Sequence, residues 1–150
     1  MTCRALVAAL FAALLVVGEP TVAQSPAPTV HVFKSATCGC CANWVKHLQQ
    51  NGFTTTVTEM ADVTEIKDQQ KVPNKARSCH TATVDGYVLE GHVPAADVQR
   101  LLKERPSILG LAVPGMPIGS PGMEVPNMAP KPYNVVSFDK EGQIQVFASH

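Results

Sequence analysis

The chain has 150 residues, of which 45% are hydrophobic and 16% charged, and its 12 basic and 12 acidic side chains give a formal net charge of zero. This length favours one domain, and the hydrophobic content is enough for a buried core. The balanced charge and the lack of a basic cluster argue against nucleic acid or an anionic membrane surface as a partner.

The first 23 residues have the pattern of a secretory signal peptide. Arg4 is the only charge before an apolar run over residues 5–17, and Thr21-Val22-Ala23 supplies the small residues that a signal peptidase reads. The run is too short for a bilayer span, which takes about 20 apolar residues. We therefore expect cleavage after Ala23, export, and no membrane span in the mature chain. An uncleaved anchor or a buried helix is the alternative.

Cleavage would remove Cys3 and leave four of the five cysteines in the mature chain. Exported proteins meet an oxidising compartment, in which thiols pair unless another group occupies them. Three of the four, Cys38, Cys40 and Cys41, lie too close together in the sequence for a simple framework of two disulfides. The cluster therefore indicates chemistry rather than structural cross-linking.

The elements predicted for a domain over residues 30–150 alternate between strands and helices, after a polar lead over 24–29. In chain order they are a strand over 30–33, a helix from the cap Thr37 to Asn51-Gly52, a strand over 53–57, a weak helix over 62–70, strands over 81–84 and 87–90 around Asp85-Gly86, and a helix between Pro94 and Pro106. Strands separated by a helix pair in parallel, whereas the hairpin adds antiparallel strands. We therefore predict an α/β domain with a mixed central sheet, in the element order of a thioredoxin-like fold.

Residues 106–132 differ from the rest in composition. They hold seven of the 12 prolines, together with Met116, Met123 and Met128. A loop of this length in a small domain is either functional or disordered. Beyond this Pro/Gly/Met-rich loop, residues 135–147 predict a C-terminal β-hairpin.

Cys38 and Cys41 lie three residues apart at the predicted start of a helix, so both face the same side. Backbone N–H groups and the helix dipole favour thiolates there, and we expect lowered pKa values for this pair. In an exported protein, a dithiol with this spacing suggests thiol-disulfide exchange. One hypothesis is therefore a thiol-disulfide oxidoreductase that uses Cys38 and Cys41.

Cys40 favours a second hypothesis, a soft-metal site. A third thiol between the redox pair offers a competing disulfide partner and disturbs simple exchange. Thiolates select Cu(I) or zinc, and three of them within four residues cannot all bind one ion at ideal angles. They can bridge several ions instead, which favours Cu(I), an ion that accepts two or three sulfur ligands, over zinc.

Cys79 and His80 directly precede the strand predicted over 81–84. In a thioredoxin-like fold this segment faces the dithiol at the start of the first helix, and the loop before the last helix, which carries His92, reaches the same edge. By this analogy of fold, Cys79, His80 and His92 converge on the cluster as further metal ligands. The alternatives are a buried free thiol for Cys79 and ordinary structural or exposed histidines.

Met116 and Met123 are further candidate ligands, because thioethers suit Cu(I). The alternative is that both side chains pack the loop onto the core. His31 and His47 are expected in structural or solvated positions.

Several segments together carry a resemblance to a known family. They are residues 34–41 with Trp44-Val45, then 78–82, 86–95, 110–117 and 119–124. With these segments, the stretch from Val32 to His150 resembles the CopG-type copper-resistance family, a group of exported proteins long catalogued as a domain of unknown function.

The resemblance implies a periplasmic, thioredoxin-like protein that serves copper tolerance. It implies that several copper ions bind through the CxCC motif, with Cys38, Cys40, Cys41 and Cys79 as ligands. Other periplasmic copper-handling proteins are expected as partners. A redox role that cycles copper between Cu(I) and Cu(II) is a further hypothesis. A binding module that only stores or transfers the metal is the alternative, so the sequence leaves open whether the chain is an enzyme.

Overall fold

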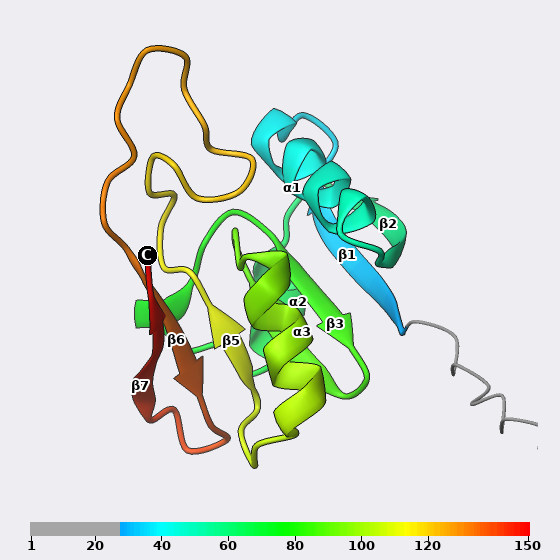
Figure 1. The fold of residues 1–150 in the computed structure, drawn as a ribbon. Helices are drawn as coiled ribbons and strands as arrows, with labels where there is room; N and C mark the ends of the chain where they lie inside the picture. The colour runs from blue at the N-terminus through cyan, green and yellow to red at the C-terminus, as the bar shows by residue number, and fades with distance from the viewer. Residues whose placement is uncertain (1–27) are drawn as a thin grey trace, which may run out of the picture.

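The computed structural model describes residues 28–150 and builds them around one mixed β-sheet (Figure 1). The predicted signal peptide over residues 1–23 and its cleavage site lie outside the described residues. None of the helices in residues 28–150 has the length and apolar character of a membrane span. In spatial order the strands are β2 (Thr54–Met60), β1 (Thr29–Ser35), β3 (Thr81–Val84), β4 (Tyr87–Glu90), β5 (Gly110–Ala112), β6 (Asn134–Phe138) and β7 (Ile144–Ser149).

The first seven α-helices and β-strands follow the predicted order, which confirms the α/β class with a mixed central sheet. The helices are α1 (Gly39–Gln50), α2 (Thr64–Gln69) and α3 (Ala95–Glu104), with a short 3₁₀ turn, η1, over Asn74–Ala76. The β1–β2 and β4–β5 pairs are parallel and the other pairs are antiparallel. This arrangement is compatible with the expected thioredoxin-like order.

Two predicted turns explain how the strands connect. Asp85 and Gly86 both have positive φ, 48° and 86°, as a two-residue hairpin turn requires. The predicted C-terminal hairpin is formed by β6 and β7. Short-range turn chemistry was therefore sufficient to place both hairpins.

The main hydrophobic core lies between one face of the sheet and the helices α1 and α3. Trp44 and Leu48 of α1 and Val98 and Leu101 of α3 are buried against strand residues such as Val32. Their spacing of three or four residues puts each pair on one face of its helix. Figure 1 shows α3 in front of the sheet and α2 behind it. A smaller apolar cluster includes residues from the segment that follows α2.

Two local expectations differ from the structure. The predicted cap Thr37 does not cap α1, because the helix begins one residue later and Cys38, with an extended backbone, takes the N-cap position. The Thr37 hydroxyl instead lies 3.1 Å from that of Ser35.

Residues 106–132 are not a loop throughout, because β5 pairs with β4 and β6. All of β5 is buried, so its sequence lacks the alternating pattern of a half-exposed strand.

Candidate metal centre

The strand register brings four separate segments to one edge of the sheet. Phe33 near the end of β1 pairs with Thr81 at the start of β3, and Thr81 in turn pairs with Glu90 at the end of β4. Glu90 also pairs with Ala112 at the end of β5. The CxCC motif, Cys79-His80, His92 and the Met-rich loop all lie just beyond these positions, and therefore meet at the same edge.

The CxCC motif forms the first half of the site, at the start of α1. Cys38 and Cys41 lie one helical turn apart and form a disulfide, with their Cα atoms 5.4 Å apart. The Sγ atom of Cys40 lies 3.5 Å from that of Cys38. Cys41 is fully buried, whereas Cys38 and Cys40 are partly exposed. Both helix-start cysteines are bonded to each other here, so neither carries a free thiol.

Cys79 joins the second half of the site to the first. Its Sγ atom lies 3.6 Å from the Sγ atom of Cys41, across 38 residues of sequence. The four sulfur atoms of Cys38, Cys40, Cys41 and Cys79 all lie within 4.8 Å of one another. The structure thus brings the four predicted thiolate ligands into a single group.

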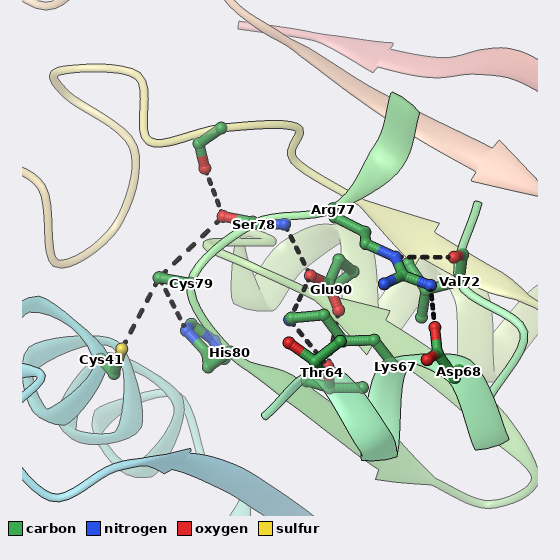
Figure 2. A network of polar contacts seen from close by, with 12 residues as sticks. Cys41, Thr64, Lys67, Asp68, Val72, Arg77, Ser78, Cys79, His80 and Glu90 are labelled. Carbon is green, nitrogen blue, oxygen red and sulfur yellow. Dashed lines mark hydrogen bonds and ion pairs between the residues drawn. The ribbon is translucent and has the colours of Figure 1, made fainter. Parts of the chain in front are cut away.

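Two buried histidines complete the second half. His80 Nδ1 lies 3.3 Å and His92 Nε2 lies 3.0 Å from the Sγ atom of Cys79. Cys79, His80 and His92 form a second group whose ligand atoms also lie within 4.8 Å of one another. Cys79 belongs to both groups, so one sulfur atom connects the thiol cluster to the imidazoles (Figure 2 shows Cys41, Cys79 and His80).

The hydrogen bonds of His92 identify its tautomer. Its Nδ1 atom lies 2.7 Å from the carbonyl oxygen of Pro121, which can only accept, so the proton resides on Nδ1. The Nε2 lone pair then points towards Cys79. A metal-binding histidine usually donates the N–H of its other ring nitrogen to a carbonyl or carboxylate oxygen in this way. Among the described residues, His80 Nε2 is the buried side-chain nitrogen or oxygen that has no hydrogen-bond partner.

Burial sets the protonation of these groups. It lowers the pKa of His92, and lowers the pKa of His80 well below its usual value, so both rings are neutral near pH 7. Burial, reinforced by nearby Cys40, raises the pKa of the Cys79 thiol to about 11. The two neutral imidazoles can therefore bind a metal without first losing a proton, whereas the Cys79 thiol must release its proton to bind one.

The Met-rich loop reaches the site at two points. A Cβ atom at Gly122 would lie 2.7 Å from both the Cys40 carbonyl oxygen and the Trp44 backbone nitrogen, so the loop packs directly on the first turn of α1. The Ser78 hydroxyl donates to the Gly115 carbonyl on the other side. Met123 follows Gly122 and is partly buried, whereas Met116 follows Gly115 and is 52% exposed.

His31 and His47 lie in structural or exposed positions, as expected. His47 Nε2 accepts a hydrogen bond from the Ala95 N–H at 3.0 Å, at the start of α3. His31 on β1 lies 2.7 Å from the Thr56 hydroxyl on β2 and is exposed.

Several neighbours of the site do not stand out in the sequence. Trp44 places its ring 4.4 Å from that of His80, and the ion pair of Lys67 and Glu90 is buried behind Cys79-His80. A glutamate at the end of an otherwise apolar strand is the one signal that could have identified Glu90. Nothing in the local pattern identifies Pro121 or Gly122, because their contacts are made across the fold.

Comparison with known proteins places the chain in a family. Two solved structures, forms 1 and 2 of the copper resistance protein CopG, each share 45% sequence identity with it at a TM-score of 0.78. The matches cover 98% of each of those chains, and 84% and 83% of this one. The chain belongs to the CopG copper-resistance family. The resemblance found in the sequence is thereby confirmed.

A family model described as a protein of unknown function, DUF411, matches residues 76–123. This CopG-family segment carries Cys79, His80 and His92 together with most of the Met-rich loop, and it begins after the CxCC motif. No curated protein sequence matches the chain.

Proposed function

We propose that this CopG-family chain is a periplasmic copper-binding protein that serves copper tolerance. The observation that carries the proposal is the mutual approach of the Cys38, Cys40, Cys41 and Cys79 sulfur atoms within 4.8 Å. Soft thiolates favour Cu(I), and the solved relatives are copper resistance proteins by name. Other periplasmic copper-handling proteins are the proposed source or destination of the metal.

The proposed site holds more than one copper ion. Three of its thiolates come from four consecutive residues, so they are better placed to bridge ions than to surround a single one. Cys79 lies between this cluster and the His80 and His92 rings, which allows it to bridge as well. Met116 and Met123 are proposed as additional thioether ligands contributed by the covering loop. Zinc fits less well, because a structural zinc site takes four ligands in a regular tetrahedron.

The disulfide makes copper loading depend on reduction. While Cys38 and Cys41 are bonded to each other, neither offers a thiolate. Two electrons and two protons convert the disulfide to two thiols, which then lose their protons on binding metal. Of the cysteine and histidine ligands, the oxidised protein keeps only Cys40, Cys79 and the two imidazoles.

An anaerobic titration of the reduced mature protein with Cu(I) tests this function. We expect more than one Cu(I) per chain, and a lower stoichiometry in Cys40→Ser. Met128→Leu is the control, since this half-exposed methionine lies outside the proposed site and its loss should leave the stoichiometry unchanged. Binding of no more than one Cu(I), or an unaltered Cys40→Ser, would contradict the multi-copper site.

The same cysteine pair can exchange electrons with copper. When the Cys38 and Cys41 thiols close into a disulfide they release two protons and two electrons, which reduce two Cu(II) ions to Cu(I). Electron paramagnetic resonance detects Cu(II) but not Cu(I), so the redox role predicts loss of the Cu(II) signal with two coppers reduced per disulfide formed. A persistent signal would leave storage or transfer of the metal as the function.

Thiol-disulfide exchange is the second candidate function, and the Cys38–Cys41 disulfide favours it. A substrate dithiol would reduce this disulfide and leave as a disulfide itself, and an added disulfide reagent would then reoxidise Cys38 and Cys41 for the next turnover. This function predicts turnover of a dithiol substrate that is abolished in Cys38→Ser and kept in Cys40→Ser. Absence of turnover in the metal-free protein would exclude it.

A further inference from the structure

The carboxylate of Glu90 is the centre of a buried polar network behind the site (Figure 2). Its Oε1 atom accepts hydrogen bonds from the Ser78 backbone N–H and from Lys67 Nζ, each at 2.6 Å. Its Oε2 atom accepts the Thr81 hydroxyl at 2.7 Å. Lys67 Nζ also donates to the Thr81 hydroxyl oxygen at 3.1 Å. Both carboxylate oxygens of Glu90 are therefore engaged by these three neighbours.

Two of the hydrogen-bond partners of Glu90, Ser78 and Thr81, flank the candidate ligands Cys79 and His80. Ser78 immediately precedes Cys79, and Thr81 immediately follows His80, so one carboxylate holds both ends of this short segment. Glu90 itself lies two residues before His92, the third member of the group. The Gly91 N–H, between them, donates to the His80 carbonyl at 3.0 Å.

The segments around Ser78 and Gly91 pack closely against each other. Gly91 has a φ of 70°, and a Cβ atom there would lie 2.5 Å from the side chain of Ser78. Any rotation of the 78–81 segment about this contact would change the distances from Cys79 to both histidines. The hydrogen bonds of Glu90 to Ser78 and Thr81 are placed to oppose such a rotation.

Stability alone is a weak reason for this arrangement. A buried ion pair loses the hydration of both charges, and replacement by apolar side chains of similar volume is often neutral or stabilising. Lys67 contacts only Glu90 and Thr81 in this network, whereas Glu90 contacts both residues that bracket Cys79-His80. The carboxylate, more than the ion pair, connects the network to the site.

We propose that Glu90 is a positioning residue of the metal centre, which fixes the geometry of Cys79, His80 and His92 through its bonds to Ser78 and Thr81. The inference rests on the proposed copper function and assigns Glu90 no direct contact with the metal. Loss of a group that orients metal ligands typically lowers metal affinity about 10- to 100-fold.

Two variants that break the same ion pair separate positioning from stability. Glu90→Ala removes the two hydrogen bonds of the carboxylate to Ser78 and Thr81, whereas Lys67→Met leaves the Glu90 carboxylate and both of these bonds in place. Glu59→Gln is the control, because Glu59 pairs with another buried lysine, Lys34, on β1 and β2. Cu(I) affinity is measured by competition with a chromophoric chelator, and stability by thermal unfolding of the metal-free protein.

We expect Glu90→Ala to lower Cu(I) affinity about 10- to 100-fold, with Lys67→Met and Glu59→Gln close to wild type even where their unfolding temperatures fall. Glu90→Gln keeps one acceptor oxygen and should fall between wild type and Glu90→Ala, so it decides the question if Glu90→Ala does not fold. Unchanged affinity in the Glu90 variants, or losses in Lys67→Met as large as theirs, would overturn the proposal.

A readout without metal keeps this proposal separate from the copper function. In the reduced metal-free protein, the alkylation rate of Cys79 should rise in Glu90→Ala while that of Cys40 stays unchanged, and Lys67→Met should alter neither. If wild-type protein bound no Cu(I), the copper function would fail, and the alkylation rates would still decide the role of Glu90. Equal Cys79 rates in wild type and Glu90→Ala would contradict it.

Discussion

The Sγ atoms of Cys41 and Cys79 lie 3.6 Å apart, although 38 residues separate them in the sequence. This approach is produced by the antiparallel pairing of β1 and β3, which sets the segment after β1 beside the segment before β3. It turns a helix-start cysteine motif into one side of a larger Cys/His site. The predictions below test the parts of that site separately.

His92 should be needed for full copper affinity. Its Nε2 lone pair faces Cys79, and the Pro121 carbonyl holds the ring in that tautomer. We expect His92→Ala to lower Cu(I) affinity by about tenfold or more, measured by chelator competition. His31→Ala is the control, because that ring is exposed on β1. Equal affinities for the two variants would remove His92 from the site.

Gly122 should be needed for the loop to cover α1. A Cβ atom there would collide with the backbone of Cys40 and Trp44, in addition to the strain of a φ of 85°. We expect Gly122→Ala to cost roughly 2–4 kcal/mol of unfolding free energy in urea, as overpacking and backbone strain combine.

Gly142→Ala is the matched control for that loss. Gly142 has a φ of 79° with open space around its Cα atom, so the substitution adds backbone strain without a collision. It should cost roughly 1 kcal/mol. A similar cost for both glycines would show that the loop does not pack tightly on the start of α1.

The metal-free protein, with the Cys38–Cys41 disulfide formed, should lose stability in both acid and alkali. The pKa values of His80 and His92 are lowered from 6.5, so below pH 6.5 the unfolded chain takes up protons that the folded chain does not, and stability falls with falling pH. The pKa of Cys79 is raised from 9.0 to about 11. Between these values the unfolded chain loses a proton that the folded chain keeps, so stability falls with rising pH.

Urea unfolding at a series of pH values checks this profile. Cys79→Ser should reduce the alkaline loss and leave the acid side unchanged, because the serine hydroxyl does not titrate in this range. An alkaline loss of the same size in Cys79→Ser would assign it to other groups.

Trp44 should report on metal binding. It is the only tryptophan of the chain, and its ring lies 4.4 Å from that of His80. A copper ion bound at Cys79 and His80 should quench its fluorescence in proportion to occupancy. Titration of Cys79→Ser with Cu(I) should give a weaker change, and equal quenching in the two proteins would indicate that copper binds elsewhere.

Local signals in the sequence were sufficient for much of the fold. The turn at Asp85-Gly86 and the helix end at Asn51-Gly52 each depend on a few neighbouring residues, and both occur as predicted. The predicted start of α1 was wrong by one residue. A hydroxyl at Thr37 suits a helix cap, and the sequence does not show that this hydroxyl contacts Ser35 instead. The strand β5 was missed because a short, fully buried strand has neither alternation nor length.

The candidate site, like the fold, could be predicted from the sequence only in part. The CxCC motif is local, and the approach of Cys79, His80 and His92 follows from strand order, so the sequence could place them near one another. Glu90 and Lys67 form their ion pair across the sheet and a helix, and no spacing rule connects residues 23 positions apart. The Cys38–Cys41 disulfide was one of two alternatives that the sequence left open.

X-ray absorption at the copper K edge, on reduced protein loaded with Cu(I), tests the central claim most directly. The account predicts sulfur as the main scatterer, a copper–copper contribution from bridged ions, and an imidazole contribution that is reduced in His92→Ala. Spectra dominated by oxygen and nitrogen, or a single copper with no copper neighbour, would contradict a multi-copper site built on Cys38, Cys40, Cys41 and Cys79.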